Sequence, residues 1–187
     1  MIKKVFILVL IAVFFSPVLS SIELAGVTVP DSITAGNNNL VLNGAGTRKK
    51  FFMKMYVGAL YLVERNSSPD KIIEADEPMA ITLHTTSSLI TSERMEEAAR
   101  EGFANATGGN TAPIADEIEK FITVFKKKIT ENDVYELIYM PGQGVKVFKN
   151  SSLKVIIKGL EFKKALFGIW LCDKPAQQSL KEQMLGK

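Results

Sequence analysis

The sequence predicts an α+β fold, built on a mainly antiparallel sheet that helices cover on one side. Segments typical of strands, helices, strands and helices follow one another in that order, as expected when a sheet and its helices form separate layers. Apolar residues recur at a three-four spacing between Ile114 and Phe125, and then at every second residue from Tyr135 to Tyr139, so the period changes from helical to strand-like. Neither an internal repeat nor a linker appears, and residues 21–187 are expected to form one domain.

The first part of the predicted domain consists mainly of strands. Their β-branched and aromatic content, or their alternation, identifies four segments: 27–30, 40–42, 50–63 and 79–86. The strand that begins at residue 40 is expected to turn through Gly44 and Gly46, because glycine accepts the backbone angles of tight turns. Ser68 and Pro69 are expected to start a short helix between the last two strands.

The second part is predicted to contain two longer helices, then strands, then two more helices. Thr91 or Ser92 caps the first helix, and residues 108–110 end it. The second carries the apolar face that runs from Ile114 to Phe125. The remaining segments are strands at 135–139, 145–149 and 153–157 and helices at 162–171 and 179–185.

Residues 1–20 are typical of a secretory signal peptide. Lys3 and Lys4 precede an apolar core at residues 5–15 that is too short for a comfortable membrane span, and small residues follow at the place that a signal peptidase reads. We expect cleavage between Ser20 and Ser21, with an uncleaved N-terminal anchor as the alternative. Such a leader suits a Gram-negative bacterium and predicts a periplasmic protein without stable membrane insertion after cleavage.

Composition excludes several classes of function. The chain has 23 Lys and Arg against 20 Asp and Glu, and loss of Lys3 and Lys4 leaves 21 against 20, which gives no electrostatic case for nucleic acid. Cys172 is the only cysteine, so an internal disulfide is impossible. Because His84 is the only histidine, we expect no zinc site, no Ser-His-Asp triad and no cofactor.

Three blocks, taken in their order and spacing, carry a family resemblance. They are residues 42–48 with 54–64, residues 91–95 leading to 101–103, and residues 165–171 followed by Lys174, Pro175 and Leu180. Together they resemble the chalcone isomerase superfamily, and most of all its bacterial chalcone isomerase-like branch. The resemblance implies an open-faced β-sandwich, with a ligand cleft between the large sheet and a helical layer.

The same resemblance implies where a site would lie. In flavonoid-making members an arginine at the position of Arg48 polarises a ketone, a strand threonine and a helix tyrosine hold a water near the ketone, and a late threonine or serine holds the far end of the substrate. These assisting positions fall at Tyr56, near Met95 and near Ala165, and the family's substrate-holding asparagine falls near Gly102. Only Arg48 is retained, so we do not expect chalcone cyclisation.

What remains is a cation and a phenol at the mouth of an apolar cleft. A guanidinium at the start of a buried strand segment needs an anionic or carbonyl partner, because an unpaired buried charge is unfavourable. The resemblance also implies fatty-acid binding, since some relatives bind fatty acids. We therefore predict a non-catalytic protein that binds a small apolar or carboxylate ligand through Arg48, Tyr56, Met95, Phe103 and Ala165. Phe51, Met53 and Trp170 are further candidates for apolar lining.

Two alternatives stay open. The protein could be an isomerase or lyase acting on a small enone, with Arg48 and Tyr56 as its catalytic residues. It could also be a scaffold whose cleft is closed by side chains, in which case Tyr56, Trp170 and Met95 are core residues. The sequence leaves the ligand and the oligomeric state open.

Overall fold

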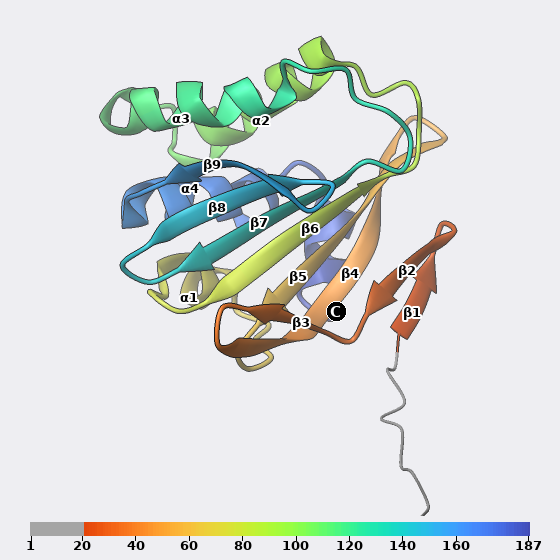
Figure 1. The fold of residues 1–187 in the computed structure, drawn as a ribbon, viewed down its shortest axis with the longest axis horizontal. Helices are drawn as coiled ribbons and strands as arrows, with labels where there is room; N and C mark the ends of the chain where they lie inside the picture. The colour runs from red at the N-terminus through yellow and green to blue at the C-terminus, as the bar shows by residue number, and fades with distance from the viewer. Residues whose placement is uncertain (1–20) are drawn as a thin grey trace, which may run out of the picture.

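Seven strands form one antiparallel sheet in which neighbours in sequence are also neighbours in space. The computed structural model describes residues 21–187, so the predicted leader lies outside the described residues. The strands are β3 (Ser32–Ala35), β4 (Asn38–Lys50), β5 (Met53–Leu62), β6 (Met79–Thr85), β7 (Val134–Met140), β8 (Gly144–Lys149) and β9 (Ser152–Ile157). A separate hairpin of β1 (Ser21–Leu24) and β2 (Val27–Pro30) precedes them (Figure 1).

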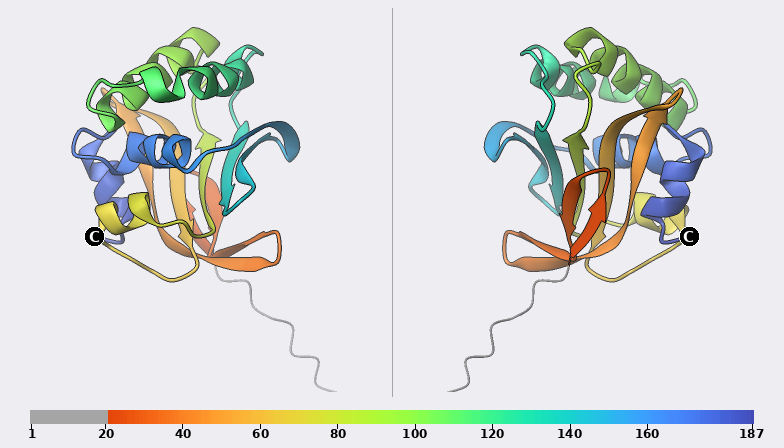
Figure 2. Two further views of the ribbon diagram at one scale, coloured as in Figure 1. Left: turned by 90° about the vertical axis from the view of Figure 1, so that its left-hand side faces the viewer. Right: turned by 90° about the vertical axis from the view of Figure 1, so that its right-hand side faces the viewer.

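Five α-helices accompany the sheet within the described residues, and short 3-10 helices at Ala112–Ile114 and Thr123–Phe125 flank the third. The α-helices are α1 (Pro69–Glu74), α2 (Ser92–Ala106), α3 (Ala115–Ile122), α4 (Leu160–Leu171) and α5 (Gln178–Met184). Figure 2 views the curled sheet from two sides, and α1, α4 and α5 lie along one of its faces. The predicted α+β fold, with an antiparallel sheet and helices on one side, is therefore confirmed. None of these helices combines the length and apolar content that crossing a bilayer requires.

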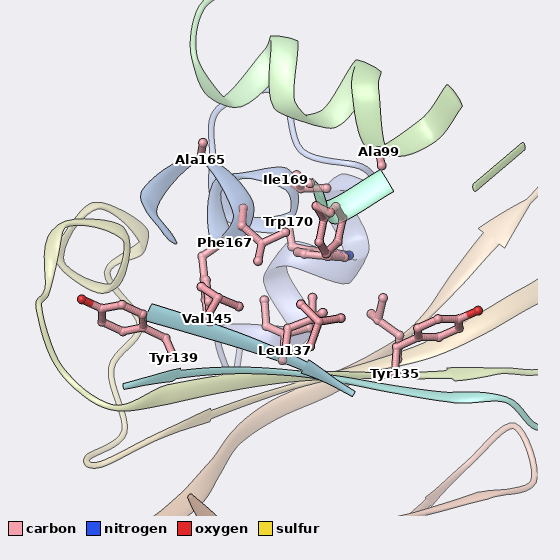
Figure 3. Packing of buried hydrophobic residues seen from close by; sticks show 14 of the residues in the cluster. Ala99, Tyr135, Leu137, Tyr139, Val145, Ala165, Phe167, Ile169 and Trp170 are labelled. Atoms are coloured by element: carbon pink, nitrogen blue, oxygen red, sulfur yellow. The ribbon is translucent and has the colours of Figure 1, made fainter. Parts of the chain in front are cut away.

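The main hydrophobic core lies between the sheet and the helices. Alternate residues of β7 and β8 face it, and Figure 3 shows Leu137 and Val145 pointing toward Phe167 and Trp170 of α4. A smaller cluster covers the other face of the sheet and includes Val29 from the β1–β2 hairpin. Because each fully buried large side chain contributes about 1.5–3 kcal/mol, the larger core holds the helices on the sheet.

The turn predicted at Gly44 and Gly46 is wrong. Strand β4 continues through both residues to Lys50, with register shifts between Leu42 and Gly44 and between Arg48 and Lys49, and the chain turns at residues 51–52. The glycines serve another purpose, because a Cβ atom at either position would overlap Gln183 of α5. Their small size lets α5 lie directly on the strand.

The other predicted elements are found close to their expected positions. Thr91 is the cap of α2, and its hydroxyl accepts a hydrogen bond from the backbone N–H of Arg94 at 3.3 Å. Pro69 begins α1, and the strands predicted from the two-residue period correspond to β7, β8 and β9. Strands β1 and β3, of four residues each, were not predicted.

Candidate ligand-binding site

Arg48 and Tyr56 lie directly opposite each other on β4 and β5. They are partners in the antiparallel ladder, and both are partly buried. Opposite residues on one face of such a ladder bring their side chains together. Trp170 of α4 completes the group, because its indole Nε1 donates a hydrogen bond to the Tyr56 hydroxyl at 3.0 Å. The sheet and the helical layer thus meet at this tyrosine.

Arg48 contacts only neutral partners. Its Nη1 atom donates to the backbone oxygen of Lys49 at 2.7 Å and to Oε1 of Gln177 at 2.9 Å. The same Gln177 oxygen also accepts from the backbone N–H of Lys49 at 2.8 Å. Across residues 21–187, no carboxylate lies within 4.0 Å of the guanidinium. Its positive charge is therefore not neutralised by the fold.

The Tyr56 phenol stays protonated at neutral pH. Burial raises its pKa, while the hydrogen bond from Trp170 and the charge of Arg48 lower it by less, so the net direction is upward. Trp170 occupies one acceptor position of the hydroxyl oxygen. The phenol can therefore donate its own proton to a ligand oxygen next to Arg48.

Two cavities meet at this pair of residues. The inner one has a volume of about 150 Å³ and lies between the sheet, α2 and α4, and the outer one has a volume of about 420 Å³ and lies beside the β4–β5 hairpin. Four residues line both of them: Arg48, Tyr56, Met95 and Ala98. Arg48 therefore borders both cavities, and a ligand in either one would lie beside this residue.

The walls of both cavities are mainly apolar. The inner cavity is further lined by Leu83, Ala99, Glu101, Gly102, Asn105, Phe121, Phe125, Tyr135, Leu137, Ile169, Trp170, Pro175 and Ala176. The outer cavity is further lined by Lys50, Phe51, Met53, Met55, Leu89, Ile90 and Arg94. Glu101 is the one acid in either lining, and it is exposed. Such an arrangement suits a ligand with an apolar body and an anionic end.

The structure brings together three of the five residues predicted for ligand binding. Arg48, Tyr56 and Met95 line both cavities, whereas Phe103 and Ala165 line neither. Phe103 is fully buried, and its ring lies 5.7 Å from those of two neighbouring phenylalanines. Figure 3 shows Ala165 on the side of α4 that faces away from the sheet.

Helix geometry explains why these two residues do not line the cavities. Met95, Ala98, Ala99 and Gly102 share one face of α2, and Phe103 lies at the edge of that face, turned by about 100° from Gly102. Ala165 lies one turn before Ile169, which does line the inner cavity, so Ala165 is displaced by about 6 Å along the axis of α4. A family resemblance carried over by counting residues does not resolve such rotations and shifts along a helix.

Gln177 was missed by sequence reasoning. It precedes α5 and reaches Arg48 across a separation of 129 residues. No local pattern marks a glutamine as the partner of a distant arginine. Within the described part of the chain, no group of three or more His, Cys, Asp or Glu side chains could hold a metal ion.

The curled antiparallel sheet, its helical layer and the cavities between them define a cleft-bearing α+β protein. The chain belongs to the chalcone isomerase-like family, whose model matches residues 21–186. In structure it is similar to a fatty-acid binding protein of Arabidopsis thaliana, with a TM-score of 0.71 and 19% sequence identity, and the match covers 89% of this chain and 96% of that one. At this identity the likeness shows the fold. No curated protein matches the sequence.

Proposed function

We propose that this protein binds, without converting it, an apolar ligand that carries a carboxylate, such as a fatty acid, and that Arg48 anchors the carboxylate. One observation carries the proposal: a partly buried guanidinium lies where two apolar cavities meet, and its hydrogen-bond partners are neutral. A carboxylate placed there would form charge-assisted hydrogen bonds, which are stronger than neutral ones.

The dimensions and lining of the cavities support the same proposal. The outer cavity, at about 420 Å³, falls within the range of about 300–1,000 Å³ that is usual for small-molecule sites. Met95 lies near the helix position where the family resemblance places a water-holding tyrosine, and a thioether is a poor hydrogen-bond partner. The Arabidopsis protein with the similar fold is named as a fatty-acid binding protein. These observations favour holding an acid over transforming one.

The test is a titration of the purified protein with a fluorescent fatty acid. We expect Arg48→Ala to weaken binding by about 10–100-fold, because hydrogen bonds to a charged group contribute about 1.5–3 kcal/mol. The matched control is Arg65→Ala, since Arg65 also donates to a backbone oxygen, that of Leu42 at 3.1 Å, but lines neither cavity. This control is expected to bind as the wild type does.

A methyl ester of the same acid provides a second control. The ester lacks the negative charge, so wild type and Arg48→Ala should bind it about equally. If both proteins bind the free acid equally well, Arg48 is not the anchor and the proposal fails.

A second candidate function rests on the cross-strand pair itself. A cation and a protonated phenol side by side could polarise the carbonyl of a small enone and protonate the product, as in an isomerase or lyase. A turnover screen against enones would compare wild type with Arg48→Ala and Tyr56→Phe. Absence of any turnover that depends on both residues would eliminate this candidate.

We also propose that the protein acts in the periplasm after its leader is removed. The support is the pattern of residues 1–20, with two lysines before a short apolar core. N-terminal sequencing of the protein recovered from a periplasmic fraction should begin at Ser21. An intact Met1 in the membrane fraction would contradict cleavage.

A further inference from the structure

The tip of the β4–β5 hairpin presents large apolar side chains to solvent. Phe51 is 84% exposed, Phe52 is 100% exposed and Met53 is 43% exposed. Figure 1 shows this tip projecting beyond the sheet, beside the connection from β6 to α2. Scattered exposed apolar residues are ordinary, but two adjacent and nearly bare phenylalanines at a projecting tip need an explanation.

The same tip carries concentrated positive charge. Residues 49–54 contain three lysines, at positions 49, 50 and 54, and no acidic residue. Arg94 of α2 lines the outer cavity together with Lys50, Phe51 and Met53. The tip is therefore both apolar and basic.

Two features of the tip are unfavourable for folding. Lys49 and Lys54 are directly opposite each other in the ladder, and like charges opposite each other destabilise a strand pair. Phe51 has a φ of 56°, in the left-handed region where hairpin turns favour glycine or asparagine. Neither feature serves the stability of the hairpin, so both point to a contact outside the fold.

We propose that this hairpin docks on the surface of an anionic lipid bilayer. Phe51 and Phe52 would enter the boundary between headgroups and acyl chains, as aromatic side chains of peripheral proteins do. Lys49, Lys50 and Lys54 would contact lipid phosphates, which relieves the repulsion between the opposed lysines. Charge complementarity selects this partner over a second copy of the chain, because two such tips repel each other.

Docking at this tip would place the outer cavity against the membrane. Phe51 and Met53 line that cavity, as does Leu89, which is 40% exposed. A fatty acid could then pass between the bilayer and the cavity without crossing water. This role in transfer rests on the proposed function, whereas docking itself rests only on the hairpin.

The experiment is co-sedimentation of the purified full chain with vesicles. One set is pure phosphatidylcholine and the other contains about one quarter phosphatidylglycerol. We expect the wild type to bind the anionic set at least about tenfold more tightly, since each lysine near an anionic surface contributes about 1 kcal/mol. We expect the double change Phe51→Gly with Phe52→Ser to lower binding by at least about tenfold.

Phe51→Gly also separates loss of binding from loss of folding. Glycine accepts a φ of 56° without strain, so this change should leave the thermal midpoint unchanged or raise it. Lys54→Glu should likewise leave the thermal midpoint unchanged or raise it, because it replaces a repulsive cross-strand pair with an attractive one. A variant that is as stable as the wild type but binds anionic vesicles more weakly supports docking through the tip.

Matched controls come from strand β9 and from the basic segment after α3. Leu153 and Ile156 are 48% and 46% exposed but lie on the opposite edge strand, and Lys127 and Lys128 are adjacent lysines outside both cavities. Leu153→Ser with Ile156→Ser, and Lys127→Gln with Lys128→Gln, should bind vesicles as the wild type does. Residues 1–20 are the same in the wild type and in every variant. Any affinity of these residues for vesicles therefore contributes equally to all the measurements being compared.

Three outcomes would overturn the proposal. They are no vesicle binding by the wild type, equal binding by wild type and tip variants, or loss of binding only in the β9 or Lys127 controls. A dimer in sedimentation velocity that disappears in the tip variant, without vesicle binding, would assign the tip to self-association instead. Fatty-acid affinity measured without vesicles tests Arg48 separately, so failure of either proposal is distinguishable from failure of the other.

Discussion

Arg48 and Lys163 are two cations withdrawn from water, and they differ in how fully the fold satisfies them. Lys163 of α4 is fully buried, and its Nζ donates to the backbone oxygens of Ile72, Ile73 and Ala75 at 2.9, 2.8 and 2.7 Å. These oxygens belong to the end of α1, where carbonyl groups lack helical partners. Arg48 has five donor hydrogens but only two hydrogen bonds to the described residues.

This difference distinguishes a buried cation that only stabilises the fold from one that can also bind a ligand. All three donors of Lys163 are used, and the Tyr139 and Phe167 rings lie 5.6 and 5.5 Å from its Nζ, so no ligand can reach it. Arg48 has unused donors beside two cavities. Spare hydrogen-bonding capacity next to open volume, rather than burial itself, marks the candidate anchor.

The largest expected effect is on stability, at Lys163. Lys163→Met removes three hydrogen bonds and leaves the end of α1 unsatisfied, so we expect the free energy of unfolding to fall by about 2–3 kcal/mol. Urea denaturation measures it, and the remaining folded protein should bind fatty acid normally. Lys164→Met is the matched control, since Lys164 makes ion pairs with the exposed Glu74 and Glu161, and its replacement should cost less than about 1 kcal/mol. Equal losses in the two variants would contradict the distinction.

The next effect is a dependence of stability on pH. Burial lowers the pKa of Lys163 from its ordinary 10.5 to about 8, although Glu74 and Asp76 raise it in part. The unfolded chain therefore binds more protons than the folded one between these two values, and stability should rise with pH there. From about pH 7 to about pH 9.5 we expect a gain of about 1–2 kcal/mol that Lys163→Met lacks.

The rise of stability with pH is expected to end near the ordinary pKa of tyrosine, about 10. Burial raises the pKa of Tyr56, Tyr135 and Tyr139, the last to about 12. Above about pH 10 the unfolded chain loses its phenol protons first, and stability falls again. A flat profile below that pH, measured by urea denaturation at each step, would mean that the three carbonyl oxygens outweigh burial and keep Lys163 charged.

The smallest expected effect on stability is at Arg48. Arg48→Gln removes two hydrogen bonds at a partly exposed position, so we expect the free energy of unfolding to change by less than about 1 kcal/mol. Ligand affinity should nevertheless fall as it does in Arg48→Ala. If Arg48→Gln instead destabilises the protein as much as Lys163→Met does, the guanidinium is a structural group and the contrast between the two cations disappears.

Local chemistry was enough to predict most of the secondary structure. The alternation of Tyr135, Leu137 and Tyr139, the cap at Thr91 and the proline at position 69 act within a few residues of chain, and the structure confirms each. The resemblance that includes Arg48 also led to the right family, because family motifs preserve order and spacing.

Tertiary contacts decided the rest. The sequence around Gly44 is typical of a turn. In the structure α5 lies directly on Gly44, and β4 continues past it to a turn that begins at Phe51. Gln177 reaches Arg48, and Lys163 reaches α1, only after distant segments pack together. The sequence by itself determined most of the strands and helices and the presence of a cation, Arg48, within a strand. What surrounds that cation, and whether room remains beside it, depends on long-range packing that no local period encodes.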